Sequence, residues 1–202
     1  MITQIFNAYS VSDTGIIKAA EILKNGGIVA IPTETVYGLA ANALNESAVA
    51  NIFAAKGRPQ DNPLIVHISD IEDIYPLVKS VPKELTLLAE RFWPGPLTVI
   101  LERSELVPAS VSAGLGTVAL RMPKDEIARQ IIKQSGVPLA APSANLSGSP
   151  SPTTAKRVIE DLDGKVDGIV VSHDCTVGVE STVITLVTDK PRLLRPGAVT
   201  LE

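Results

Sequence analysis

Short apolar runs alternate with helix-like segments along the whole chain, and this alternation limits the fold more than any other feature. The runs of strand length are 28–31, 64–68, 97–101, 118–120, 139–141, 169–171, 183–187 and 192–194. Many connections between them are too short for the crossover helix that joins parallel neighbours. The pattern therefore predicts an α/β fold with a twisted, mixed parallel and antiparallel sheet and helices on its faces.

Helices are predicted where apolar residues recur at helical spacing between start and stop signals. The first is expected to begin at Ser12-Asp13, to face Ile16 and Ile17 inward and to stop at Gly26-Gly27. A second follows Asn45 as N-cap. It ends near Lys56-Gly57. The remaining helices are expected at 71–78, 82–92, 125–134 and 151–162.

Composition indicates one globular domain over residues 1–202. A chain of this length buries roughly 70% of its unfolded surface in a single domain, and no Ser/Gly-rich linker divides it. Net charge is -4, so the surface as a whole is not the basic field of a nucleic-acid binder. Cys175 is the single cysteine, which excludes an internal disulfide and favours the cytoplasm. No apolar stretch has the length of a membrane span.

Two nucleotide-binding motifs can be excluded from the sequence. No GxxxxGK[ST] loop occurs. The string GLGTVA at 114–119 matches a dinucleotide fingerprint, but it follows a loop and leads into the predicted strand 118–120. That fingerprint must instead follow a strand and open a helix. We therefore expect no Rossmann-type site.

The segment 32–39, PTETVYGL, follows the predicted strand 28–31 directly. Loops at strand ends are where α/β folds place ligand-binding groups. The same residues also suit a plain turn, in which Pro32 sets a bend, threonine hydroxyls satisfy backbone groups and Gly38 permits an unusual dihedral angle. Both interpretations stay open from these residues alone.

Basic residues stand at one helix end and at two strand ends. Lys56 and Arg58 lie where the helix after Asn45 stops. Two cations there would suit a polyphosphate, and solvated side chains that complement the helix dipole are the alternative. Arg121 and Arg195 each end a predicted strand and are followed within two residues by proline. Their guanidinium groups would suit a carboxylate or a phosphate.

Small polar side chains occur near further strand ends. Ser143 and Asn145 follow the apolar run 137–141, and no GxSxG motif supports a nucleophile, so Ser143 is a candidate hydrogen-bonding ligand. Ser151 precedes the predicted helix 151–162, where free N–H groups bind phosphate, and plain capping explains it as well. The stretch GVEST at 178–182 offers another hydroxyl or a simple turn.

Seven blocks taken together resemble the YrdC-like threonylcarbamoyl-AMP synthase family. They are PTETVYGL at 32–39, KGRPxDNPLIVH at 56–67, WPGPLT at 93–98, TVALRMP at 117–123, APSANLSG at 141–148, GVEST at 178–182 and LRPG at 194–197. Blocks in this order over nearly the whole chain are far more specific than one short motif. The DNPLIVH and GVEST blocks look most like the catalytic domain of the family's long, two-domain form.

The resemblance implies a twisted mixed sheet around a deep, locally positive cavity for ATP and L-threonine. The implied threonine ligands are Thr35, His67, Arg121, Ala141 and Ser181. The implied ATP ligands are Arg58, Asn62, Thr117, Ser143, Asn145, Ser151 and Arg195. Lys56 and Arg58 would stabilise charge on the reacting phosphates, and Arg121 would receive the threonine carboxylate.

The implied reaction joins L-threonine, bicarbonate and ATP into threonylcarbamoyl-adenylate and releases pyrophosphate. It would make the chain a nucleotidyltransferase that supplies a threonylcarbamoyl transferase acting on tRNA. Two distant histidines and one cysteine give no metal-binding spacing, so we expect no metal on protein side chains. Mg²⁺ would enter with ATP.

Two other functions remain open beside this one. The first is an RNA-binding or ribosome-associated role without turnover, and the net charge of -4 counts against strong binding to double-stranded RNA. The second is a related carbamoyl-adenylate chemistry, as in the YrdC-like module of hydrogenase maturation proteins, which normally lies within a much larger chain.

Overall fold

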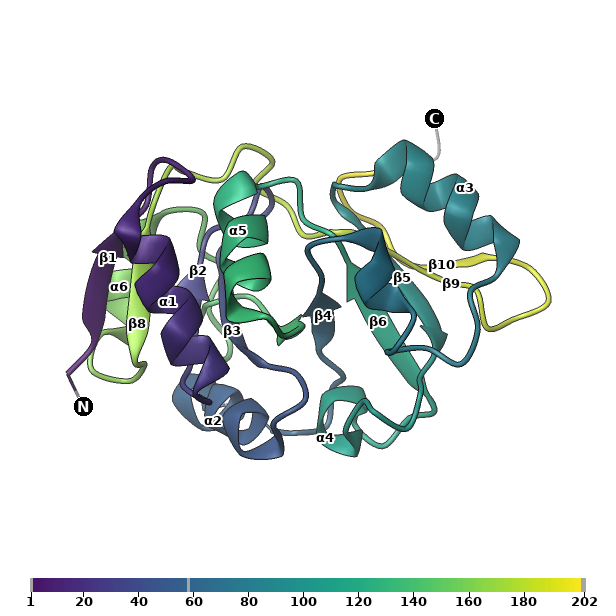
Figure 1. The fold of residues 1–202 in the computed structure, drawn as a ribbon, viewed down its shortest axis with the longest axis horizontal. Helices are drawn as coiled ribbons and strands as arrows, with labels where there is room; N and C mark the ends of the chain where they lie inside the picture. Colours follow the sequence, from purple (N-terminus) through teal and green to yellow (C-terminus); the bar gives the residue numbers. More distant parts are fainter. Residues whose placement is uncertain (1, 58, 201–202) are drawn as a thin grey trace.

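A computed structural model describes residues 2–57 and 59–200 (Figure 1). Within these residues, ten strands form a sheet in the order β1-β8-β2-β3-β7-β4-β6-β5-β9-β10. The strands are β1 Gln4–Asn7, β2 Val29–Ile31, β3 Gly38–Asn42, β4 Ile65–His67, β5 Leu97–Glu102, β6 Thr117–Arg121, β7 Leu139–Ala140, β8 Gly168–Val171, β9 Thr182–Thr185 and β10 Arg192–Arg195.

The sheet mixes both strand directions. Parallel pairs are β1–β8, β2–β8, β4–β6 and β5–β9. Antiparallel pairs are β2–β3, β3–β7, β4–β7, β5–β6 and β9–β10. This arrangement confirms the predicted α/β fold with a mixed sheet.

Helices cover the sheet, and α1 and α5 lie side by side on the face toward the viewer in Figure 1. The helical segments are α1 Thr14–Lys24, α2 Glu46–Lys56, η1 Ile71–Ile74 (a 3₁₀ turn), α3 Lys83–Phe92, α4 Ala109–Ser112, α5 Glu126–Ser135 and α6 Ala155–Leu162. The ends of α2 follow the predicted signals. Asn45 accepts a hydrogen bond from the Ala48 N–H at the start, and Gly57 takes the left-handed conformation at the end, which is a common helix stop.

Two apolar cores occupy opposite faces of the sheet. Successive side chains of a strand point to opposite faces. In β2, Val29 and Ile31 therefore belong to the smaller core under α1 and α5, while Ala30 belongs to the larger core on the other side. Burial on both faces explains why the strand runs are apolar throughout rather than alternating.

Several predicted boundaries differ from the structure. Ile17 is exposed, because the buried face of α1 carries Ile16, Ala19 and Leu23 at helical spacing instead. The helix expected at 71–78 is a 3₁₀ turn that ends at Ile74, two residues before Pro76. Tyr75, the residue before Pro76, keeps helical backbone angles (φ -54°, ψ -42°), so the bias of such a residue away from helix does not explain this end.

The helix expected to open at Ser151-Pro152 begins only at Ala155. Thr154 is its N-cap, and its side chain accepts a hydrogen bond from the Arg157 N–H. Ser151 therefore lies outside the helix, so the predicted helix start at this residue is wrong, while its contact with ATP stays a prediction. Three elements were not predicted at all, namely β1, β3 and the four-residue α4.

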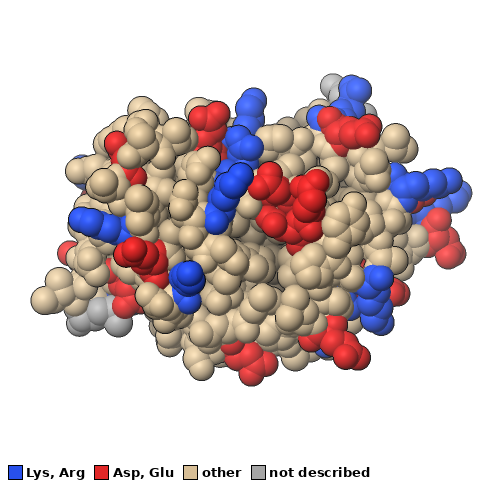
Figure 2. Space-filling view, viewed as in Figure 1, with Lys and Arg blue, Asp and Glu red and all other residues tan. Residues whose placement is uncertain are grey.

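Charged side chains of both signs are interspersed on the face shown in Figure 2, without a continuous basic area. Mixed charge of this kind gives little local attraction for a nucleic-acid backbone on this face. Separately, none of the helices in the described ranges combines the length and the apolar character needed to cross a membrane.

Candidate active site

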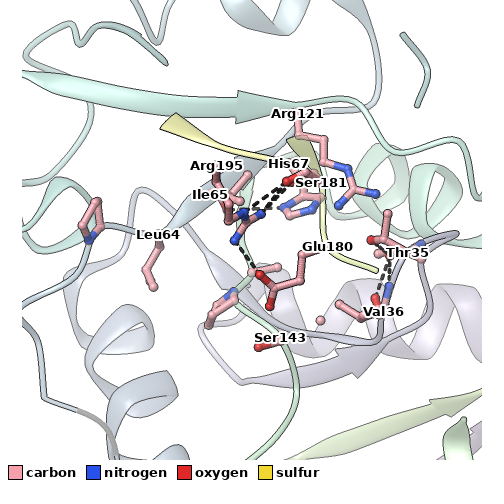
Figure 3. Close-up of a pocket in the computed structure, with 15 residues that line it drawn as sticks. Thr35, Val36, Leu64, Ile65, His67, Arg121, Ser143, Glu180, Ser181 and Arg195 are labelled. Carbon is pink, nitrogen blue, oxygen red and sulfur yellow. Dashed lines mark hydrogen bonds and ion pairs between the residues drawn. The ribbon is translucent and has the colours of Figure 1, made fainter. Parts of the chain in front are cut away.

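Strand ends from both halves of the sheet surround a cavity of about 130 Å³ (Figure 3). Pockets for drug-sized ligands occupy roughly 300–1,000 Å³, so this cavity has the size for a small molecule such as an amino acid. A nucleotide would have to extend beyond it. The lining residues are Thr33, Thr35, Val36, Gly38, Pro63, Leu64, Ile65, His67, Arg121, Ala141, Pro142, Ser143, Glu180, Ser181 and Arg195.

Most of the residues that the sequence singled out lie together in this lining. All five predicted threonine ligands are present, together with two of the predicted ATP ligands. These seven are Thr35, His67, Arg121, Ala141, Ser143, Ser181 and Arg195. They come from segments more than 150 residues apart in the chain. The assignments implied by the family resemblance therefore converge on one cavity wall, and Arg121, Ser143 and Arg195 among them also follow predicted strands.

Other predicted ATP ligands lie away from the lining. Thr117 is at the opposite end of β6 from Arg121, paired with Glu102. The exposed Asn62 amide contacts the neighbouring Asp61 carboxylate at 3.2 Å. Arg58, predicted both as an ATP ligand and as a catalytic residue, lies outside the described residues. Nucleotide contacts at these positions stay predictions.

A buried ion pair supports the wall of the cavity at Arg121. Its Nη2 lies 2.7 Å from Glu34 Oε1, and the two side chains are only 5% and 6% exposed. Nε donates to the Gly95 carbonyl at 3.4 Å. Among the described residues Nη1 has no hydrogen-bond partner, so Glu34 fixes the guanidinium plane while Nη1 stays available to an anion in the cavity.

Arg195 is held differently from Arg121. Its Nε and Nη2 both donate to the Ser181 carbonyl, and Nη2 also donates to Ser181 Oγ at 3.1 Å. Its Nη1 lies 2.6 Å from Glu180 Oε2, while Glu180 Oε1 accepts from Ser151 Oγ at 3.0 Å. Four hydrogen bonds therefore tie this guanidinium to protein oxygens. A phosphate at Arg195 would have to compete with the Glu180 carboxylate.

Glycine is required where the chain after β10 passes the 180–182 segment. A Cβ atom at Gly197 would lie 2.4 Å from the Glu180 carbonyl oxygen and 2.5 Å from the Thr182 nitrogen. Real Cβ atoms do not approach backbone so closely, so a side chain here would push the two segments apart. The glycine of the LRPG block therefore keeps Arg195 against Ser181.

Lys56 at the end of α2 is 3% exposed and binds the 143–145 loop. Its Nζ donates to the backbone carbonyls of Ser143 and Asn145, and to Asn145 Oδ1 at 3.4 Å. The same Oδ1 accepts from Ser143 Oγ at 2.6 Å. These contacts favour a positioning role in which Lys56 shapes the loop that presents Ser143. Direct action of Lys56 on a phosphate stays a prediction.

His67 is buried at the end of β4 beside Arg121. Burial, which disfavours the charged form, and the positive charge of Arg121 lower the pKa of His67 from 6.5 to about 3. Nδ1 lies 3.3 Å from the Ile65 carbonyl, to which it can donate when it carries the ring proton, and the ring also interacts with the Leu139 backbone. His67 therefore presents an uncharged imidazole to the cavity at physiological pH.

The lowered pKa of His67 predicts a pH-dependent loss of stability. Between pH 6.5 and about 3 the unfolded chain binds a proton that the folded protein does not. The free energy of unfolding should therefore fall by about 1.4 kcal/mol per pH unit as the pH drops through this window. A His67→Gln variant lacks this contribution, so urea unfolding of both proteins at several pH values should give a shallower slope for the variant. Parallel slopes would contradict the assignment.

Sequence reasoning missed the acidic partners of both arginines. Glu34 and Glu180 stand inside blocks that were recognised, PTETVYGL and GVEST, yet neither was selected. A signal existed, since each is the one charged residue of its block and buried charges require a partner. The partner of Glu34 is 87 positions away in sequence, which no local pattern reveals.

The described residues contain no cluster of side chains that could form a metal-binding site. Within 2–57 and 59–200, no group of three or more His, Cys, Asp or Glu side chains is arranged to hold a metal ion. The acidic side chain in the cavity, Glu180, is already paired with Arg195.

Comparison with known proteins identifies relatives over nearly the whole chain. A family model for Sua5, YciO and YrdC proteins, described as "Telomere recombination", matches residues 21–197. A threonylcarbamoyl-AMP synthase of Pyrococcus abyssi is 56% identical over 184 residues, which cover 91% of this chain and 54% of the relative. A threonylcarbamoyl-AMP synthase of Bacillus subtilis is 53% identical and is covered to 56%, against 96% of this chain.

A solved structure of a related protein has the same fold as this chain. The crystal structure of P. abyssi Sua5 complexed with L-threonine superposes with a TM-score of 0.94 at 53% identity, over 96% of this chain and 58% of that one. The chain thus spans a little more than half the length of these three proteins.

Proposed function

The chain belongs to the Sua5/YciO/YrdC family, and from this premise we propose that it is an L-threonylcarbamoyladenylate synthase. In this proposal it is a nucleotidyltransferase that converts L-threonine, bicarbonate and ATP into threonylcarbamoyl-AMP and pyrophosphate. The product passes to a threonylcarbamoyl transferase that modifies tRNA.

One observation carries the proposal, namely the amino-acid-sized cavity with Arg121 on its wall. The guanidinium keeps Nη1 available and is oriented by a buried carboxylate, which suits recognition of a small carboxylate ligand. The related P. abyssi protein with this fold was crystallised with L-threonine, which fits such a cavity. Threonine bound through Arg121 would have its short side chain against the apolar wall formed by Val36, Ile65 and Ala141.

The reaction requires the protein mainly to position the carbamate and ATP relative to each other. The threonine nitrogen and bicarbonate form a carbamate, with loss of water. A carbamate oxygen then attacks the α-phosphorus of ATP, the bond from that phosphorus to the β-phosphate oxygen breaks, and pyrophosphate leaves with the bonding electrons. No covalent enzyme intermediate is needed. Mg²⁺ bound to ATP would neutralise part of the phosphate charge.

The chain's own residues would orient the two reactants. Arg121 holds the carboxylate of the amino acid, and Ser143, which lines the cavity on the loop that Lys56 holds, would bind the nucleotide. Correct alignment of two bound reactants alone can contribute roughly 7–11 kcal/mol to lowering a barrier. The buried surroundings strengthen each polar contact.

The direct test is detection of the product by mass spectrometry. The purified chain is incubated with ATP, bicarbonate and L-threonine, and each substrate is omitted in turn. We expect threonylcarbamoyl-adenylate only in the complete mixture, with a 1:1 yield of pyrophosphate. A product that persists without threonine would overturn the substrate assignment. Complete absence of product, together with absence of threonine binding in calorimetry, would overturn the function.

A further inference from the structure

The hydroxyl group of Ser181 in the cavity wall is held from two sides. Thr98 Oγ1, on β5, lies 2.7 Å from Ser181 Oγ. Arg195 Nη2 donates to the same oxygen at 3.1 Å. Thr98 is fully buried and does not line the cavity, whereas Ser181 does. Figure 3 shows Ser181 beside His67 and Arg195.

The direction of the hydrogen bond between Thr98 and Ser181 follows from the available partners. In the described part of the chain, Ser181 Oγ is the single hydrogen-bond partner of the Thr98 hydroxyl. If Ser181 were the donor, the buried Thr98 proton would have no acceptor, which is costly. Thr98 is therefore the donor. A hydroxyl oxygen has two lone pairs, and those of Ser181 are taken by Thr98 and Arg195. The Ser181 proton is left to point into the cavity.

The hydroxyl of Thr35, by contrast, is not fixed by its neighbour. The Thr33 hydroxyl donates its single proton to the Val36 carbonyl at 2.6 Å, and it accepts from the N–H groups of Thr35 at 3.2 Å and of Val36 at 3.3 Å. Its two lone pairs are thus already occupied. The 2.9 Å contact between the hydroxyls of Thr33 and Thr35 therefore does not set the direction of the Thr35 proton.

We propose that Thr98 is a positioning residue that fixes the hydrogen-bonding polarity of Ser181, so that the Ser181 hydroxyl donates to the bound amino acid. The inference deepens the proposed function and rests on it for the identity of the ligand. Ser181 would donate to an oxygen of the carboxylate that Arg121 holds.

The fixed polarity would act through preorganisation. A serine hydroxyl in an open pocket normally reorients when a ligand binds and can serve as donor or acceptor. Here the orientation of the Ser181 hydroxyl is fixed before the ligand binds, so binding costs less conformational entropy. The arrangement also rejects ligands that present a donor to Ser181, because two donors would then face each other without an acceptor between them.

Neutron diffraction from deuterated crystals tests the polarity without reference to turnover. We expect the Thr98 deuterium on the line to Ser181 Oγ and the Ser181 deuterium directed into the cavity. A Ser181 deuterium directed at Thr98 would overturn the proposal.

Kinetics of two Thr98 variants test the consequence for the substrate. Thr98→Val keeps the size and removes the donor, so the KM for L-threonine should rise about 5-fold while kcat and the KM for ATP stay within 2-fold of wild type, the loss corresponding to one neutral hydrogen bond. Thr98→Ser retains a hydroxyl and should restore the wild-type KM. Equal effects of both variants, or a general loss of kcat, would show a merely structural role and contradict the inference.

The outcomes separate this inference from the proposed function. If wild-type protein makes no threonylcarbamoyl-adenylate, the function fails while the neutron result still decides the polarity. If wild-type protein makes the product and Thr98→Val leaves the KM for threonine unchanged, the function stands and the positioning role of Thr98 is wrong. Melting temperatures of both variants, expected to lie within about 4 °C of wild type, verify that folding is not the cause.

Discussion

Arg121→Met is expected to abolish L-threonine binding and to lower the free energy of unfolding by about 3–5 kcal/mol. The substitution removes the cation proposed to hold the carboxylate. It also leaves Glu34 buried without its partner at 2.7 Å, and an uncompensated buried charge is strongly destabilising. Calorimetric titration with threonine and urea unfolding at neutral pH measure the two effects.

The double variant Glu34→Gln/Arg121→Met is the matched control for this prediction. It removes both charges and keeps the side-chain volumes similar, so most of the lost stability should return. Threonine binding should remain absent, because the cation is still missing. Wild-type threonine affinity in either variant would refute the role of Arg121 as the carboxylate ligand. A double variant no more stable than Arg121→Met would refute the ion-pair explanation.

Lys56→Met is expected to slow threonine-dependent pyrophosphate release about 100-fold. A shift of about 1 Å in a substrate-positioning group has an effect of this size on the rate. The ammonium group holds the carbonyls of Ser143 and Asn145, and methionine offers them no donor. The loop that presents Ser143 should therefore loosen. Faster amide hydrogen exchange over 143–147 would be the accompanying sign. A phosphate assay under saturating substrates gives the rate.

Lys165→Met provides the comparison for Lys56. Lys165 also donates to a backbone carbonyl, that of Asp161 at 2.8 Å, but it is exposed and lies outside the cavity lining. Its replacement should leave the rate unchanged. A Lys56 variant with slow turnover but unaltered exchange over 143–147 would point to direct action on the phosphates rather than to positioning. A Lys56 variant with wild-type turnover would exclude both roles.

The sequence predicts the location of the site better than its internal contacts. Arg121, Ser143 and Arg195 each follow an apolar strand, the family resemblance assigns them to one site, and the sheet does bring those strand ends to one cavity. Thr117 and Arg121 lie at opposite ends of one strand of five residues, which is roughly 16 Å long. The resemblance assigns them to different ligands, and the contact of Thr117 with ATP stays a prediction.

The contacts that sequence reasoning could not supply are those between distant segments. Glu34 pairs with Arg121, and Thr98 meets Ser181, across 87 and 83 positions. The lone charge of Glu34 signals that a partner is needed but does not identify Arg121, and a threonine within a strand such as Thr98 is compatible with a plain core position. Strand β3 was missed for a related reason: its residues 38–42 are small and overlap a segment interpreted as a ligand loop.

The pairing of β5 with β9 has a consequence for how the protein is made. Leu97 and Thr182 are partners in that parallel pair, although synthesis separates them by most of the second half of the chain. Pairings of such sequence separation close late and slowly. During translation, the edge of the sheet near Thr98 stays unpaired until Ser181 and Arg195 emerge from the ribosome. The cavity is therefore expected to be among the last parts of the nascent protein to form, and until then its exposed edge is open to chaperones and to aggregation.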